Sequence, residues 1–288
     1  MASPTQPRRT AIVTGAARGI GKAIALRLAS DGYSICLNDI PTSLPSLTTL
    51  ATEINNAHPS PTSSPRAIAV PADVTSSKEV EDLISQSVAQ LGPLALMVAN
   101  AGIAQIKPLL DTSADDVKEV FDVNFNGVYN CYTAAARQMI KQGDPRDVFG
   151  KSADGKPCVG VYKILGAASI VGFKAFATLG IYSASKWAVR GLTQAMAMEM
   201  AGHRITVNSY APGIVGTAMW DQIDEKLGEL DGREKGESIK KYSSELIALG
   251  RTSEPEDVAG LVGGFLATGD SDYVTGQTML VDGGIIFT

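Results

Sequence analysis

The stretch TGAARGIG at residues 14–21 decides the fold of this chain, because it joins a strand-like run to a helical pattern. The apolar run covers residues 11–13, and residues from about 20 to 30 repeat with helical periodicity. Glycines at such a turn permit positive φ and a close approach of the backbone to a ligand. A helix that begins there presents free N–H groups and the positive end of its dipole. A strand, a glycine turn and a helix in this order are typical of a phosphate-binding site.

The spacing in this turn, T-G-x-x-x-G-x-G, differs from the G-x-G-x-x-G of the usual dinucleotide-binding turn. A glycine-rich turn that binds no ligand is the alternative interpretation. We favour a site for the pyrophosphate of a dinucleotide. The residues expected to form it are Gly15, Arg18, Gly19, Ile20 and Gly21.

Apolar runs of strand length alternate with helix-length segments along the rest of the chain. Buried strands that alternate with helices imply a parallel sheet that is covered on both faces. We therefore expect residues 1–288 to form a single α/β domain of the Rossmann type, a doubly wound parallel sheet with helices on both faces. After the first run, the expected strands are residues 34–37, 67–70, 94–99, 159–165, 205–209 and 279–281.

Two polar segments interrupt the alternation. Residues 58–65 are rich in proline and serine and are expected to form a surface loop. Residues 143–157 contain several turn-forming residues and are expected to form a surface insertion. Loops of this length tend to be functional or disordered, and we favour a disordered or decorative segment over a functional one.

Composition and charge exclude several classes of function. The net charge of −5 and the pI of about 5.2 argue against nucleic acid as a partner. No apolar run reaches the roughly 18 residues of a membrane span. The three cysteines form no CxxC pair, and His58 and His203 lie far apart, so we expect no metal. An odd cysteine count and the lack of a signal-peptide pattern favour the cytosol.

Asp39 follows Gly21 by eighteen residues, at the end of the predicted second strand. An acidic residue at about that separation can accept hydrogen bonds from the adenosine ribose hydroxyls. Its charge would repel a 2′-phosphate, whereas Arg18 would attract one. On this balance we favour NAD, with NADP possible. A helix N-cap is the alternative role for Asp39.

Tyr182 and Lys186 stand four residues apart in YSASK and would share one face of a helix. An ordinary tyrosine has a pKa near 10, and lowering it by about three units requires roughly 4 kcal/mol of differential interaction, which a close ammonium can contribute. Such a tyrosine can donate a proton to a carbonyl oxygen while hydride reaches the carbon. The pair alone is a weak signal. Ser183 with Lys186 also matches the S-x-x-K pattern of a serine hydrolase, although its partner motifs are missing.

Three further elements strengthen the assignment. Ser169 lies thirteen residues before Tyr182, Asn124 lies on an earlier predicted helix, and residues 100–102 (NAG) close the predicted fourth strand. Together with the glycine turn, they resemble the short-chain dehydrogenase/reductase family over residues 11–284, the insertion excepted.

The resemblance implies an NAD(P)-dependent oxidoreductase that acts on a ketone or secondary alcohol and assembles as a homotetramer or dimer. Tyr182 would be the general acid/base, Lys186 would bind the nicotinamide ribose and lower the pKa of Tyr182, and Ser169 would hydrogen-bond the substrate oxygen. Asn124 would hold a water that links Lys186 to solvent. Further cofactor contacts would come from Asp73, Val74, Asn100, Ala101, Gly102, Pro212, Gly213, Val215 and Thr217.

Within the family, residues 185–194 and 208–224 are most similar to acetoin/diacetyl reductases, also called butanediol dehydrogenases. This similarity implies a small hydroxyketone or vicinal diol as substrate. Residues 217–249 would form a small helical lid that excludes water from the substrate. Two alternatives are a biosynthetic dehydrogenase of a bulkier terpenoid, polyketide or polyol alcohol, and a dinucleotide-binding protein without catalysis. The candidate pocket residues are Val171, Met219 and Trp220.

Overall fold

A seven-stranded parallel sheet in the order β3-β2-β1-β4-β5-β6-β7 forms the centre of the protein. The computed structural model describes residues 8–59, 64–152, 155–232 and 234–288. The predicted α/β fold of the Rossmann type is confirmed. The strands are β1 Thr10–Val13, β2 Ser34–Leu37, β3 Ala67–Ala69, β4 Leu94–Ala99, β5 Tyr162–Ala167, β6 Ile205–Pro212 and β7 Thr278–Val281.

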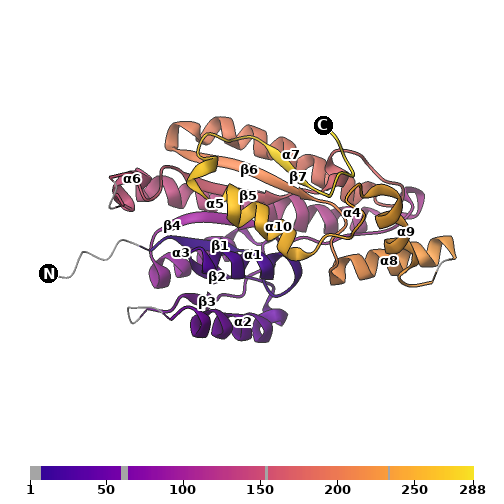
Figure 1. The fold of residues 1–288 in the computed structure, drawn as a ribbon, viewed down its shortest axis with the longest axis horizontal. Coiled ribbons are helices and arrows are strands. Elements are labelled where there is room, and N and C mark those ends of the chain that lie inside the picture. Colours follow the sequence, from indigo (N-terminus) through magenta and orange to yellow (C-terminus); the bar gives the residue numbers. More distant parts are fainter. Residues whose placement is uncertain (1–7, 60–63, 153–154, 233) are drawn as a thin grey trace.

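Helices cover both faces of the sheet (Figure 1). On one face α1 packs against α2 and α10, and on the other α5 packs against α3 and α7. Strands β1, β4 and β5 are buried along their whole length, which explains their apolar sequences. The helices are α1 Gly19–Ser30, α2 Leu44–Ala57, α3 Ser77–Leu91, α4 Ala114–Phe121, α5 Gly127–Gln142, α6 Pro145–Val148, α7 Gly180–Met200, α8 Ala218–Asp231, α9 Glu237–Leu246 and α10 Pro255–Leu261.

Several strand boundaries differ from the prediction by one to three residues, and the two largest differences are the start of the fifth strand and the end of the sixth. The fifth strand begins at Tyr162, three residues later than expected, where it first pairs with β6: the Tyr162 N–H donates to the carbonyl of Arg204, the residue before β6. The sixth strand continues to Pro212 because β7 pairs with its last four residues. The predicted loop at 58–65 lies partly outside the described residues.

The described part of the 143–157 segment is anchored to the sheet. Asp144 caps α6 through the backbone N–H of Arg146, and the Phe149 ring is fully buried against Tyr162, with 6.1 Å between ring centroids. Figure 1 shows α6 at the opposite end of the molecule from α8 and α9. This segment therefore lies near the amino ends of the strands.

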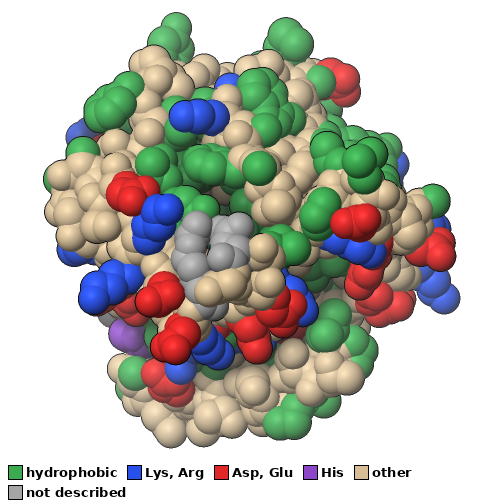
Figure 2. Space-filling view, turned by 90° about the vertical axis from the view of Figure 1, so that its right-hand side faces the viewer, with side chains coloured by type: hydrophobic (Ala, Val, Ile, Leu, Met, Phe, Trp, Pro, Cys, Tyr) green, Lys and Arg blue, Asp and Glu red, His purple; other side chains and the backbone are tan. Residues whose placement is uncertain are grey.

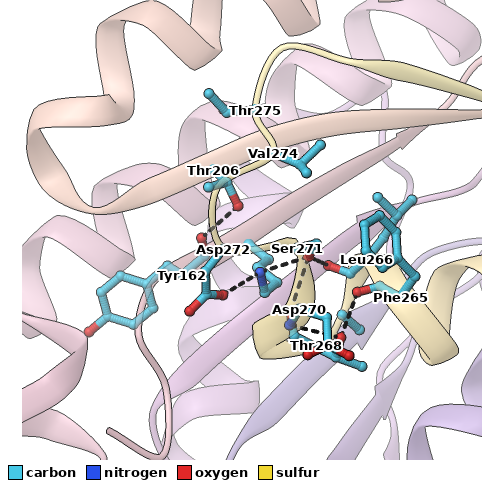
Figure 3. Close-up of polar contacts among 12 residues, drawn as sticks. Tyr162, Thr206, Phe265, Leu266, Thr268, Asp270, Ser271, Asp272, Val274 and Thr275 are labelled. Carbon is cyan, nitrogen blue, oxygen red and sulfur yellow. Dashed lines mark hydrogen bonds and ion pairs between the residues drawn. The ribbon is translucent and has the colours of Figure 1, made fainter.

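An ion pair between a buried lysine and a partly exposed aspartate holds the segment before β7 against the sheet. The Lys163 side chain on β5 is 6% exposed, and its ammonium lies 2.8 Å from the Asp272 carboxylate and 3.0 Å from the Ser271 hydroxyl. Figure 3 shows Ser271 and Asp272 side by side, with Ser271 also bonded to Leu266. Burial lowers the pKa of Lys163, and the pairing with Asp272 opposes that shift.

We expect Asp272→Ala to destabilise the fold by about 2 kcal/mol, because it leaves a buried ammonium without its carboxylate. The measurement is equilibrium unfolding in urea. Asp270→Ala is the matched control, since Asp270 is exposed in the same turn. Equal midpoints for the two variants would show that the ion pair contributes nothing.

Candidate active site

A cleft of about 1040 Å³ opens at the carboxyl ends of the strands and is bounded on one side by α8 and α9. Figure 2 looks onto this end of the molecule, where hydrophobic side chains gather in the upper part of the face. All the predicted cofactor and pocket residues line the cleft, as do Ser169, Tyr182 and Lys186. Asn124 does not line it and is completely buried.

Three glycines shape the turn after β1 and the start of α1. Gly15 has φ +63° and Gly19 has φ +54°, in the region that favours glycine. At Gly21 an added Cβ would lie 2.1 Å from the Gly15 oxygen and 2.7 Å from Nδ2 of Asn100. The backbone at the start of α1 therefore approaches the turn more closely than any side chain would allow.

The start of α1 is suited to a pyrophosphate. Arg18 is the N-cap residue, and in the part of the chain that the structure describes its side chain makes no capping hydrogen bond to the first N–H groups of the helix. Such free N–H groups, together with the helix dipole, attract a phosphate. Because Arg18 and Gly19 both line the cleft, these residues fit the predicted dinucleotide.

Asn100 joins the glycine turn to the neighbouring strands. Its Nδ2 donates to the Thr14 carbonyl at 3.0 Å, and its Oδ1 accepts the Tyr210 hydroxyl proton at 2.9 Å. The Thr14 hydroxyl accepts the N–H groups of Asn100 and Ala101. Sequence reasoning missed Tyr210, because the predicted strand stopped one residue before it.

The Asp39 carboxylate lies at the rim of the cleft beside the glycine turn. It accepts the N–H of Ala17 at 3.1 Å and that of Ile40 at 2.9 Å. The N-cap of α2 is Ser43 and that of the preceding 3₁₀ turn is Ile40, so the alternative role of Asp39 as a helix cap is wrong. Its remaining oxygen lone pairs can serve ribose hydroxyls.

Ser169, Tyr182 and Lys186 meet where β5 ends and α7 begins. The Lys186 ammonium donates to the Ala167 carbonyl at 2.8 Å and lies 5.5 Å from the centroid of the Tyr182 ring. All three side chains are at most 9% exposed. The arrangement places a phenol, a hydroxyl and an ammonium in one wall of the cleft.

Burial dominates the proton affinities of this group. It raises the pKa of Tyr182 to about 12, although a hydrogen bond with Ser169 acts in the opposite direction. It lowers the pKa of Lys186 to about 8. Tyr182 is therefore a protonated phenol at neutral pH in the structure as described, and Lys186 loses its proton more easily than an exposed lysine.

Asn124 lies in a π-helical turn, Asp122–Asn126, between α4 and α5. Its Oδ1 accepts the Ile103 N–H at 2.9 Å, and its Nδ2 donates to the Ile103 carbonyl and to the Ser185 hydroxyl. Both amide protons are thus used by the protein. The role of Asn124 in holding a water molecule stays a prediction. The structure shows that its side chain fixes the backbone of Ile103, in the segment after β4, through two hydrogen bonds.

The serine hydrolase alternative does not fit the geometry. Ser183 is 2% exposed, it does not line the cleft, and its hydroxyl has no hydrogen-bond partner among the described residues. The Lys186 ammonium is directed to the Ala167 carbonyl. Within the described ranges, His, Cys, Asp and Glu side chains form no group of three that could hold a metal ion, and the helices there are too short or too polar to cross a bilayer.

The two ends of the predicted lid, residues 217–249, are held together by the segments that flank it. Val215 pairs with Ser253 as a β-bridge, and the Gly216 N–H donates to the Ser253 carbonyl at 2.9 Å. Inside the lid, the buried Asp224 carboxylate on α8 accepts the N–H groups of Gly236 and Ile239 and so joins α8 to α9. Lid side chains that line the cleft are Met219, Trp220, Gln222, Ile223, Leu227, Tyr242 and Leu246.

Comparison with known proteins agrees with this geometry. Residues 9–228 match the family described as short chain dehydrogenase. The chain is 44% identical to the L-2,3-butanediol dehydrogenase of Corynebacterium glutamicum, with 97% of this chain and 99% of that protein aligned. It is 43% identical to a diacetyl reductase [(S)-acetoin forming] of Staphylococcus epidermidis, with the same coverage.

A variant of actinorhodin polyketide ketoreductase, solved with NADPH, superposes with a TM-score of 0.83 at 27% identity, and the match covers 96% of this chain and 97% of that one. The chain therefore belongs to the short-chain dehydrogenase/reductase family. It is an oxidoreductase that acts on CH–OH groups with NAD(P).

We expect Asp39→Ala to raise the ratio of NADPH-linked to NADH-linked kcat/KM at least about ten-fold, because it removes a charge that repels a 2′-phosphate. The measurement is steady-state kinetics with both coenzymes. Asp39→Asn removes the charge but keeps the size of the side chain, and it should shift the ratio of the two kcat/KM values in the same direction. An unchanged ratio in both variants would contradict a ribose-binding role for Asp39.

Proposed function

We propose that this protein interconverts a small α-hydroxyketone or vicinal diol with its oxidised partner, and that NAD is its preferred coenzyme. The observation that carries the proposal is the wall formed by Ser169, Tyr182 and Lys186 in a cleft that begins at an uncapped helix N-terminus. The names of the relatives from Corynebacterium and Staphylococcus support the acetoin-type substrate. Asp39 at the rim supports NAD.

In the proposed reaction a bound nicotinamide supplies or accepts the hydride, and the protein handles the proton. Tyr182 donates its phenolic proton to the carbonyl oxygen in reduction and takes it back in oxidation. The Ser169 hydroxyl hydrogen-bonds the same oxygen and holds it beside the phenol. Lys186 stabilises the phenolate that remains.

Burial keeps the phenol of Tyr182 protonated at neutral pH, so the proton is in place for reduction, but the raised pKa also makes the phenol a weaker acid. The lowering of this pKa by Lys186, which the family resemblance implies, stays a prediction. Lys186 remains mostly protonated at neutral pH because its pKa is about 8. The ammonium is therefore available to offset the negative charge left on the phenol oxygen after donation. In oxidation, the tyrosine must first lose its proton.

A bulkier terpenoid, polyketide or polyol alcohol is the second candidate. Residues 217–249 contribute mostly apolar side chains to the cleft, which suits an apolar substrate. The similarity to a polyketide ketoreductase fold also favours it. The acetoin-type proposal is preferred because the relatives that carry that name are more similar in sequence.

Assembly and location also remain proposals. We propose a homotetramer or dimer, supported by four apolar side chains that are at least 40% exposed: Tyr129 and Ile140 on α5, and Trp187 and Met198 on α7. The cytosolic location stays a prediction from the sequence.

We expect Tyr182→Phe to lower kcat for diacetyl reduction by several orders of magnitude and to leave NADH binding intact, since only the proton donor is removed. The measurements are steady-state kinetics and NADH fluorescence titration. Turnover close to that of the unaltered protein would overturn the role of Tyr182. A non-catalytic dinucleotide-binding protein would bind NADH equally in both forms and turn over in neither.

The pH dependence should differ between the two directions. Reduction requires the protonated phenol, so its kcat/KM should stay nearly constant through neutral pH and fall only as pH approaches the pKa of Tyr182, about 12. Oxidation requires the phenolate, so its kcat/KM should increase with pH, because burial raises the pKa of Tyr182. Rate profiles with acetoin reduction and butanediol oxidation test this, and parallel profiles would contradict it.

A further inference from the structure

The segment after β4 passes along the catalytic wall and is fixed at two points. At Ile103, the N–H and the carbonyl are both bonded to the Asn124 side chain. At Lys107, the N–H donates to the Thr178 carbonyl at 2.8 Å. Gln105 lies midway between these anchors, so its backbone position is well determined.

Neighbours of Gln105 pack against the residues around the candidate proton donor. Ala104 and Ile106 contact the apolar cluster that contains Val171 and Tyr182. Gln105 itself lines the same cleft as Ser169 and Tyr182. Its side chain therefore belongs to the substrate end of the cleft, away from the glycine turn.

The Gln105 carboxamide makes no hydrogen bond to any residue that the structure describes, although the side chain is partly buried. The other two side-chain amides that line the cleft are in different situations. Asn100 is hydrogen-bonded to Thr14 and Tyr210, and Gln222 is exposed to solvent. The carboxamide is not among the fully buried unpaired groups of the described residues, so its donors and acceptor remain open to the cleft. A carboxamide that no described residue occupies, on a backbone fixed at both ends, is available to bind a ligand.

We propose that Gln105 binds the second oxygen of the substrate, the one on the carbon adjacent to the reacting carbon. A carboxamide can donate to a ketone oxygen and accept from a hydroxyl, so one side chain serves a diketone, a hydroxyketone and a diol. Gln105 thereby selects substrates with two vicinal oxygens over simple ketones. This inference rests on the proposed function and names the feature of the substrate that the site recognises.

The test compares two substrates that differ in that oxygen. The purified proteins are the unaltered chain, Gln105→Ala and Gln105→Leu, and the substrates are diacetyl and 2-butanone with NADH. We expect kcat/KM for diacetyl to fall about ten-fold or more in both variants, as for the loss of a hydrogen bond from a partly buried site. For 2-butanone it should change by no more than about two-fold.

Gln86→Ala on α3 is the matched control, since Gln86 is exposed and outside the cleft. It should leave both substrates unaffected. NADH fluorescence titration and thermal unfolding show whether the Gln105 variants fold and bind coenzyme. Equal changes for the two substrates, or no change, would overturn the role of Gln105 while leaving the proposed reaction in place. Failure of the unaltered protein to reduce diacetyl would instead reject the acetoin-type function.

Discussion

The hydrogen bond from the buried Lys186 ammonium to the Ala167 carbonyl fixes the geometry on which the site depends. Ala167 is the last residue of β5, and Lys186 lies in the second turn of α7. Ser169 follows Ala167 by two residues, and Tyr182 precedes Lys186 by one helical turn. A single buried bond between strand and helix thus determines the distance between the hydroxyl and the phenol.

Gly102, after β4, packs closely against both Lys186 and Asn124. An added Cβ at Gly102 would lie 3.1 Å from Oδ1 of Asn124 and 3.4 Å from Nζ of Lys186. Asn124 in turn holds the backbone of Ile103 and the hydroxyl of Ser185 on α7. The ends of β4 and β5, the π-helical turn and α7 are therefore held together by side-chain hydrogen bonds, so the wall is rigid where the proposed proton transfer occurs.

The sequence could predict the sheet because central parallel strands are buried on both faces and have nearly continuous apolar sequences. It could also predict which side chains gather at the carboxyl edge, since Gly15, Asn100 and Ser169 each follow a strand. Two features could not be predicted. The contacts of Asn124 depend on a π-helical turn, and the course of the backbone around Gln105 depends on how Lys107 meets Thr178, 71 positions later. The spacing of apolar residues along the sequence carries no information about either of these contacts between distant residues.

The site has an energetic cost that follows from its chemistry. Lowering the pKa of Lys186 from 10.5 to about 8 means that the fold disfavours the ammonium by about 3 kcal/mol. Below pH 8 this lysine is protonated in both folded and unfolded chains, so the cost is present in full, and it declines as pH rises toward 10.5. Contacts elsewhere, such as the apolar packing of β1, β4 and β5, must offset it. The buried lysine is therefore better explained by proton chemistry in the cleft than by stability of the fold.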